Sequence, residues 1–291
     1  MPKIISDASD AMTPEQERGI KNHFTEVLLR LAPTKADAQR IMRRIGELRS
    51  NASETLTTLG GMRYRSERFA STYGYTLSVK PVCEQLLMLK SFPLFQKLDC
   101  FQALNCAKSM AQIPEGADGN FVFPYWGLIG KTYAEATERV AQELVRVYNM
   151  KNRLERRLSE KHLRQYDPTR QALEAIRAAQ PGDFQIFPVQ FGILHRGESV
   201  RLVRDILLPK EFGLGPYEVG IMLLTHPERL DAYEKLFIDC PGAEYDYDVA
   251  DRGRVPCFYL YDGQWRFNSN SVDAPCDHYG SASAFFPQSK P

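Results

Sequence analysis

A two-residue turn near the end of the chain constrains the fold more strongly than any other feature of the sequence. Asp262-Gly263 separates two stretches of strand length, residues 255–261 and 264–267. The Asp-Gly pair favours a type I′ turn, because both central residues of that turn adopt positive φ angles. The sequence therefore predicts an antiparallel hairpin, and hence a β-sheet, in the C-terminal part of the chain.

Residues 182–242 form the middle of the same predicted domain. They contain three apolar runs of strand length, among them 184–191 and 219–224, with glycines at the expected turns. Polar residues follow the first run at 195–199, and the pair Asp239-Cys240 follows the last expected strand. Loops at strand ends often carry functional side chains, so these two groups are the first candidates for chemistry.

Helical patterns dominate the beginning of the chain. Thr13-Pro14 with Gln16 makes a capping box that opens an amphipathic helix, and further helices are expected as far as residue 110. We therefore expect a helical region over residues 1–115.

A turn cluster at residues 113–120 separates this helical region from an α+β domain that is expected over residues 120–291. An amphipathic repeat near the start of this domain predicts a long helix over about 132–164. The predicted fold class is thus α+β, with a mostly helical N-terminal half and a small mixed or antiparallel sheet in the C-terminal half.

Composition limits the class of protein. The chain has 37 basic and 36 acidic residues and a formal net charge of +1, so it has no global basic field for nucleic acid. The N-terminus lacks the apolar core of a secretion signal, and no apolar run is long enough to span a bilayer. Six scattered cysteines without a CxxC motif indicate reduced thiols. We expect a soluble, cytoplasmic protein without membrane contact.

The residues at 195–199 combine several chemistries before an expected helix. His195, Arg196, Glu198 and Ser199 supply an imidazole, a guanidinium, a carboxylate and a hydroxyl within five positions. Unpaired N–H groups at a helix N-terminus attract anions, and Arg196 could hold a carboxylate or phosphate with two hydrogen bonds. In the alternative interpretation, Ser199 or Glu198 caps the helix and Arg196 makes a structural ion pair.

Asp239 and Cys240 complete the set of ligand-binding candidates. Cys240 could act as a thiol nucleophile if a histidine such as His195 or His226 folded beside it. A buried cysteine that behaves as a small apolar residue is the alternative.

A second hypothesis is a nucleotide- or phosphate-handling enzyme. The segment Gly127-Leu-Ile-Gly130-Lys131-Thr132 follows a possible strand and opens a helix, so it resembles a phosphate-binding P-loop. Lys131 and Thr132 would bind phosphate, and Asp239 in the DCPG sequence would lie on the magnesium side. The bulky Tyr125 and Trp126 stand where the loop needs small residues, and the alternative is an ordinary strand-to-helix turn.

A third hypothesis is zinc-dependent hydrolysis. Cys276-Asp277-His278, together with Cys240, Cys257 or His226, offers enough ligands for one zinc ion. Structural zinc sites usually show paired ligands at a spacing of two to four residues, and only one such pair is present. The sequence therefore predicts no metal site and no cofactor.

Nucleic acid is a further possible partner. Basic residues within 151–164 could form a stripe along the long predicted helix and contact phosphates. Acidic residues interrupt this stripe, so a solvated helix face is the favoured interpretation.

Three phrases in the last third of the chain resemble a family of uncharacterised bacterial proteins: HRGESVR at 195–201, GIMLLTHPERL at 220–230 and FNSNSVDAPCDHYGSASAFFPQ at 267–288. The resemblance implies a bacterial, cytosolic, single-copy domain and carries no activity, cofactor or catalytic residue. The leading hypothesis from sequence is accordingly a binding or interaction protein whose partner is an unknown small molecule or protein.

Overall fold

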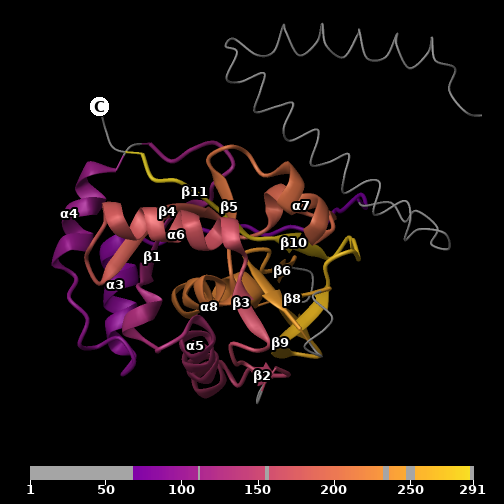
Figure 1. The fold of residues 1–291 in the computed structure, drawn as a ribbon, viewed down its shortest axis with the longest axis horizontal. Coiled ribbons are helices and arrows are strands. Elements are labelled where there is room, and N and C mark those ends of the chain that lie inside the picture. The colour runs from indigo at the N-terminus through magenta and orange to yellow at the C-terminus, as the bar shows by residue number, and fades with distance from the viewer. Residues whose placement is uncertain (1–67, 111, 155–156, 232–235, 247–252, 289–291) are drawn as a thin grey trace, which may run out of the picture. The chain divides into compact units, whose positions relative to one another are not determined.

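Two β-sheets and the helices around them make up the described part of the chain (Figure 1). The computed structural model describes residues 68–110, 112–154, 157–231, 236–246 and 253–288. All of these residues belong to one unit of the chain, residues 66–291. The capping box at Thr13 and the helices expected after it lie outside the described residues.

The smaller sheet is antiparallel throughout and has the strand order β1-β4-β11-β5. Its inner strand β4 is buried at all seven positions, and apolar side chains lie on both of its faces beside the buried Gln185 and Gln190. The strands are β1 (Gly119–Pro124), β4 (Phe184–Gln190), β5 (Glu211–Gly213) and β11 (Ser283–Phe285).

The larger sheet has seven strands and is mixed, because β10 pairs with β6 and β2 with β9 in parallel. Its main path runs β10-β6-β8-β7-β3, and β9 pairs with β8 along the full length of both strands. The strands are β2 (Lys151–Asn152), β3 (Leu163–Gln165), β6 (Phe237–Asp239), β7 (Ala243–Tyr245), β8 (Arg254–Tyr261), β9 (Gln264–Ser271) and β10 (Tyr279–Ser281).

Helix α8 occupies the centre of the fold, and all ten of its residues are buried (Figure 1). It packs against α5, α3 and β1. A Cβ atom at Gly220 would lie 2.7 Å from Val140 Cγ1, so glycine allows α8 to approach α5 closely. The helices are α3 (Val82–Ser91), α4 (Phe101–Ser109), α5 (Tyr133–Tyr148), α6 (Asp167–Ala179), α7 (Val200–Ile206) and α8 (Pro216–Thr225), with 3₁₀ turns η1 (Trp126–Leu128), η2 (Ile193–His195) and η3 (Pro227–Leu230).

The predicted distribution of helices and strands is wrong. The fold is α+β, but one sheet has seven strands and is not small, and the described helices alternate with strands as far as Thr225 instead of collecting in the N-terminal half. Helices α3 and α4, which were expected in a separate helical region, belong to the same unit as both sheets. The apolar run 219–224 was of strand length, yet it forms part of α8, because complete burial removes the periodicity that separates a helix from a strand.

The long helix predicted over 132–164 is also too long. Helix α5 ends at Tyr148, where Asn149 adopts the left-handed conformation with φ 52°, and the chain then enters β2. Asparagine tolerates this conformation and commonly ends helices. The described residues of 151–164 therefore lie in no helix, and the expected basic stripe for nucleic acid loses its geometric basis.

The hairpin expected around Asp262-Gly263 is formed by β8 and β9. Asp262 has φ 52° and Gly263 has φ 67°, as a type I′ turn requires.

Among the described residues, no helix combines the length and apolarity needed to cross a membrane.

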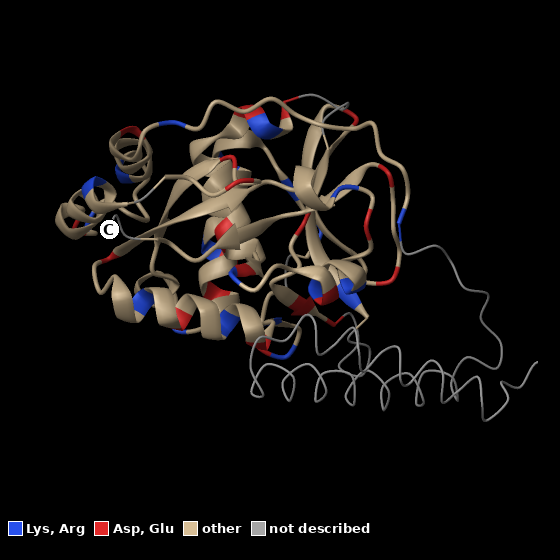
Figure 2. Ribbon diagram, turned by 90° about the horizontal axis from the view of Figure 1, so that it is seen from above, with Lys and Arg blue, Asp and Glu red and all other residues tan. Residues whose placement is uncertain are grey.

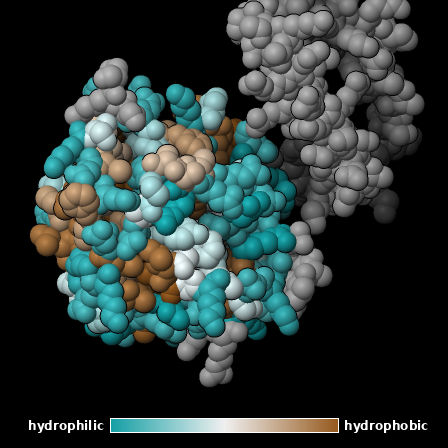
Figure 3. Space-filling model, turned by 60° about the vertical axis from the view of Figure 1, so that its left-hand side comes forward, coloured by the Kyte–Doolittle hydropathy of each residue, from teal (hydrophilic) through white to brown (hydrophobic). Residues whose placement is uncertain are grey.

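The described surface mixes charge signs and polarity. Acidic and basic positions alternate along the outer face of α6, from Asp167 to Arg177, and both signs are interspersed elsewhere (Figure 2). The side that carries α3 and α4 shows hydrophobic patches among hydrophilic side chains (Figure 3). Leu87 on α3 and Phe101 on α4 are 72% and 69% exposed.

Candidate functional site

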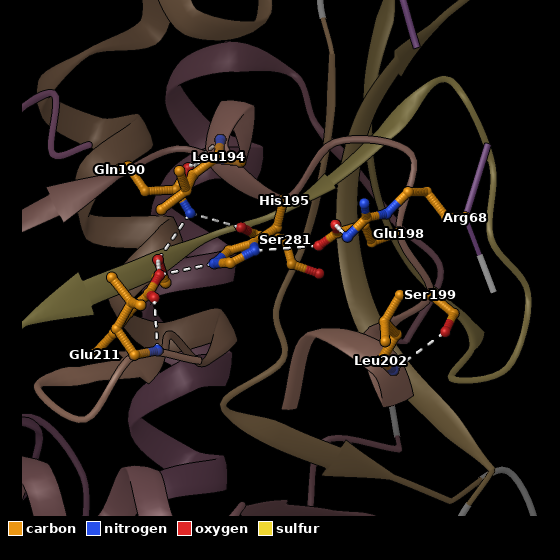
Figure 4. Close-up of polar contacts among 12 residues, drawn as sticks. Arg68, Gln190, Leu194, His195, Glu198, Ser199, Leu202, Glu211 and Ser281 are labelled. Carbon is orange, nitrogen blue, oxygen red and sulfur yellow. Dashed lines mark hydrogen bonds and ion pairs between the residues drawn. The ribbon is translucent and has the colours of Figure 1, made fainter. Parts of the chain in front are cut away.

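His195, a ligand-binding candidate from the sequence, is buried between two glutamates (Figure 4). Its Nε2 lies 2.7 Å from Glu211 Oε1 and its Nδ1 lies 3.2 Å from Glu198 Oε2. Carboxylate oxygens accept hydrogen bonds, so this arrangement favours the form of the ring that donates from both nitrogens, which is the imidazolium cation. Burial opposes this charge, but the hydrogen bonds and negative charges of Glu211 and Glu198 outweigh it and raise the pKa of His195.

The contacts continue from both glutamates. Glu198 Oε1 pairs with Arg68 Nη2 at 2.5 Å. Glu211 accepts hydrogen bonds from the Ser283 hydroxyl and from the Leu208 amide, and the pKa of Glu211 is lowered because these bonds and the His195 cation outweigh the effect of burial.

Gln190 extends these contacts beyond Glu211 and Ser283. Gln190 Nε2 donates to Ser283 Oγ and to the Ser281 carbonyl, both at 2.8 Å. We call this set the His195 network: Arg68, Gln190, His195, Glu198, Glu211 and Ser283. It joins β4, η2, β5 and β11 through hydrogen bonds in which the polar groups of the network are one another's partners. The network therefore has the character of a structural connection between strands.

The other candidates near His195 have separate roles. Ser199 caps α7 by accepting the amide of Leu202 at 3.2 Å, as the alternative interpretation of the sequence required. Arg196 is exposed and donates to the Tyr73 carbonyl at 3.3 Å. The structure thus brings His195 and Glu198 into one network and places Arg196 and Ser199 outside it.

Asp239 and Cys240 lie in the interior at the end of β6. Asp239 is 2% exposed, burial raises its pKa to about 8, and its Oδ1 has no hydrogen-bond partner among the described residues. Burial also raises the pKa of the Cys240 thiol. His226, the proposed neighbour of Cys240, instead accepts the Lys80 amide at 3.0 Å. These surroundings keep the Cys240 thiol protonated and disfavour a nucleophilic role.

Lys131 and Thr132 stand at the start of α5, where they take part in a capping box. Thr132 Oγ1 accepts the amide of Glu135 at 3.1 Å, and Glu135 Oε2 accepts the amide of Lys131 at 2.8 Å. A carboxylate therefore occupies the helix N-terminus, where a phosphate would bind in a P-loop.

A pocket of about 260 Å³ lies between α6, the end of β1, β4 and the first turn of α8. We call it the aromatic pocket. Its apolar wall includes the aromatic rings of Phe123, Tyr125, Trp126, Phe187 and Tyr217. None of the candidate residues from the sequence lines it.

Glu218 is the buried acid of the aromatic pocket. It is 2% exposed, and its Oε2 accepts a hydrogen bond of 2.8 Å from the Tyr133 hydroxyl. Burial raises the pKa of Glu218 to about 7, and the hydrogen bonds from Tyr133 and from the backbone of the first turn of α8 oppose this shift only in part. Glu218 can therefore gain or lose a proton near neutral pH.

A second polar group on the pocket wall has no protein partner. Gln165, at the end of β3, lines the pocket, and its buried Nε2 makes no hydrogen bond with any described residue. An unpaired buried amide donor costs roughly 1–3 kcal/mol, so a ligand that accepted this hydrogen bond would gain from it. The pocket thus combines aromatic walls with one ionisable acid and one unused donor.

Neither polar group of the pocket is among the candidate residues predicted from the sequence. Glu218 left a signal, because it is the one charged residue within residues 215–225, a run of otherwise uncharged residues. Gln165 left none. Tyr125 and Trp126, which are too bulky for a P-loop, contribute aromatic rings to the wall of the pocket.

Comparison with known proteins gives no template for this arrangement. No protein-family model, curated protein or solved structure matches the chain.

Proposed function

We propose that this protein binds a small, mostly apolar molecule that carries a basic nitrogen, and that the ligand lies in the aromatic pocket with its nitrogen against Glu218. The observation that carries the proposal is a buried carboxyl group with a pKa of about 7 on the wall of a pocket lined by aromatic rings. A perturbed acid in a pocket is a common mark of a functional site.

The walls of the pocket support a small ligand with a flat or apolar body. Ligand pockets usually measure about 300–1,000 Å³, and the volume of about 260 Å³ is slightly below that range, so it suits a small molecule. Aromatic faces attract both apolar groups and cations.

Glu218 supports a positive charge on the ligand. Its pKa is high because burial disfavours the carboxylate and no cation compensates in the described residues around it. An ammonium group beside Glu218 would favour the ionised form, so the pKa would fall and a proton would be released on binding near pH 7.

The two arginines on the pocket wall already have partners. Arg170 pairs with Glu174 at 2.9 Å and with Asp167 at 3.3 Å. The Arg177 guanidinium lies 4.5 Å from the centre of the Tyr125 ring and donates to the Gly182 carbonyl. These contacts favour a cationic ligand that complements Glu218 over an anion that would need the arginines.

Calorimetric titration of the full chain with small arylalkylamines and their neutral hydroxyl analogues tests the proposal. We expect amines to bind more tightly than the analogues, and we expect proton release at pH 7 when two buffers of different ionisation enthalpy are compared. Glu218→Gln should weaken amine binding by about tenfold or more, because it removes a charge-assisted hydrogen bond.

Glu174→Gln is the matched control, because Glu174 lines the same pocket but its side chain is 63% exposed. Leu173→Trp places a larger side chain on the pocket wall. It should abolish binding, because the indole ring fills the volume that the ligand would occupy. Equal binding of amines and alcohols, or equal affinities for Glu218→Gln and the wild type, would contradict the proposal.

This proposal keeps the binding role that was the leading hypothesis from sequence and moves it to another place. The residues at 195–199 were expected to face the ligand, whereas His195 and Glu198 pair with each other and with other protein groups.

A further inference from the structure

We propose that Cys276, Asp277 and His278 form a binding site for a zinc ion. We call these three residues the Cys276 cluster. One ligand atom from each of them lies within 4.8 Å of the other two. This site is independent of the aromatic pocket, and either proposal can fail without the other.

Two of the three distances within the cluster are close to those of a metal site, and the third is a hydrogen-bond distance. Cys276 Sγ lies 3.7 Å from Asp277 Oδ1 and 3.8 Å from His278 Nδ1, and the Nδ1–Oδ1 distance is 2.6 Å. Ligand atoms around a tetrahedral zinc ion lie roughly 3.3–3.6 Å apart, given the usual bond lengths of about 2.0–2.3 Å. To bind a zinc ion, His278 Nδ1 and Asp277 Oδ1 would have to move slightly apart. Both atoms would then coordinate the ion, and the hydrogen bond between them would be lost.

The same geometry argues against a catalytic relay of cysteine, histidine and aspartate. In such a relay, one ring nitrogen faces the nucleophile and the other faces the acid. Here Nδ1 is the ring atom nearest both the thiol and the carboxylate, so sulfur, nitrogen and oxygen converge on one point. Convergence of a thiolate, an imidazole and a carboxylate suits zinc, which accepts all three types of ligand.

The backbone of the cluster is fixed by neighbouring segments. The Ser71 hydroxyl donates to the Asp277 carbonyl, and the amide of Phe237 on β6 donates to the His278 carbonyl at 2.8 Å. The His278 ring also lies against the Tyr73 ring, with centroids 4.1 Å apart. These contacts hold the ligands in place before an ion arrives, which reduces the entropic cost of binding.

The cluster is open to solvent on one side. The side chains of Asp277 and His278 are 44% and 31% exposed. Three protein ligands leave one position of a tetrahedral zinc ion for water, which is the arrangement of catalytic zinc sites and not of closed structural ones. The partners considered from sequence, Cys240, Cys257 and His226, are not part of the cluster that the described residues form.

Titration of the full-length, chelator-treated protein with Co²⁺, followed by zinc competition against a chromophoric chelator, tests the site. Co²⁺ should give visible absorption bands of a tetrahedral site and a near-ultraviolet thiolate band at one equivalent, and Zn²⁺ should displace it. Cys276→Ser should remove the thiolate band, and both Cys276→Ser and His278→Gln should weaken metal binding by about tenfold or more.

Cys83→Ser is the matched control, because Cys83 is an exposed free thiol outside the cluster. It should leave the spectrum and the affinity unchanged. Circular dichroism would verify that the variants fold. We expect them to fold, because the three side chains are partly exposed. A wild-type protein without a one-equivalent site, or a thiolate band that persists in Cys276→Ser, would overturn the proposal.

Discussion

At the scale of single residues, the described interior holds several ionisable groups, and they differ in whether a partner balances their charge. His195 and Glu211 compensate each other, so the pKa of His195 is raised and that of Glu211 is lowered although both groups are buried. Asp239 has no compensating group among the described residues and is largely protonated at neutral pH, since burial raises its pKa to about 8. Glu218 lies between these cases, with a pKa of about 7.

Removal of one partner from the His195 network should be costly. Glu211→Gln leaves the buried His195 cation with a weaker partner, and we expect a loss of about 3–5 kcal/mol in the free energy of unfolding. Urea denaturation of both proteins measures this difference. Glu174→Gln, which breaks the pair with Arg170, should cost far less, because both side chains of that pair are largely exposed. If the two variants lose the same stability, the network does not connect the strands as described.

At the scale of elements, caps and close approaches explain where the chain changes direction. The capping box at Thr132 begins α5, and the left-handed Asn149 ends it. The aromatic pocket lies beside the first turn of α8, where Glu218 meets Tyr133 from the first turn of α5. Two helix starts therefore supply the polar end of the proposed ligand site.

Substitutions at the start of α5 distinguish a cap from a phosphate site. Thr132→Ala should reduce the free energy of unfolding by about 1 kcal/mol, because it removes the cap on Glu135 N. Lys131→Ala should change stability little, since the side chain is exposed. We further expect no shift of the melting temperature with millimolar ATP or GTP and magnesium. A shift that Lys131→Ala abolishes would support the nucleotide hypothesis instead.

At the scale of the whole molecule, the shifted groups together set how stability depends on pH. Asp239 and Glu218 keep their protons in the folded state well above the pH at which they ionise in the unfolded chain. Their contribution to the free energy of unfolding therefore falls as pH rises towards 8. His195, whose folded pKa is raised, also contributes less as pH rises through that value. His226 has a lowered pKa of about 4 in the folded state, against 6.5 in the unfolded chain. It makes the protein more stable as pH rises between these two values, and has no such effect above pH 6.5.

We therefore expect the melting temperature to fall between pH 6.5 and pH 8. The slope for each proton involved is about 1.4 kcal/mol per pH unit. Asp239→Asn should reduce this slope, because the amide does not ionise, whereas Asp205→Asn at an exposed position of α7 should leave it unchanged. Thermal denaturation across this pH range measures the effect, and identical slopes for Asp239→Asn and the wild type would refute it.

The sequence by itself determined the features that depend on neighbouring residues. Asp262-Gly263 specifies its turn through φ angles that the two residues tolerate, and Thr132 and Ser199 cap helices through hydrogen bonds within three positions. Only the tertiary structure decided the features that depend on burial and on distant partners. The run 219–224 lies in a helix that is buried at every position, so no periodicity in its sequence distinguishes a helix from a strand. Glu218 acquired its shifted pKa inside a pocket whose walls come from β1, β3, β4, α6 and α8. Local backbone preferences act within a few residues, whereas burial and charge depend on which distant segments pack together, and that is settled only when the whole chain folds.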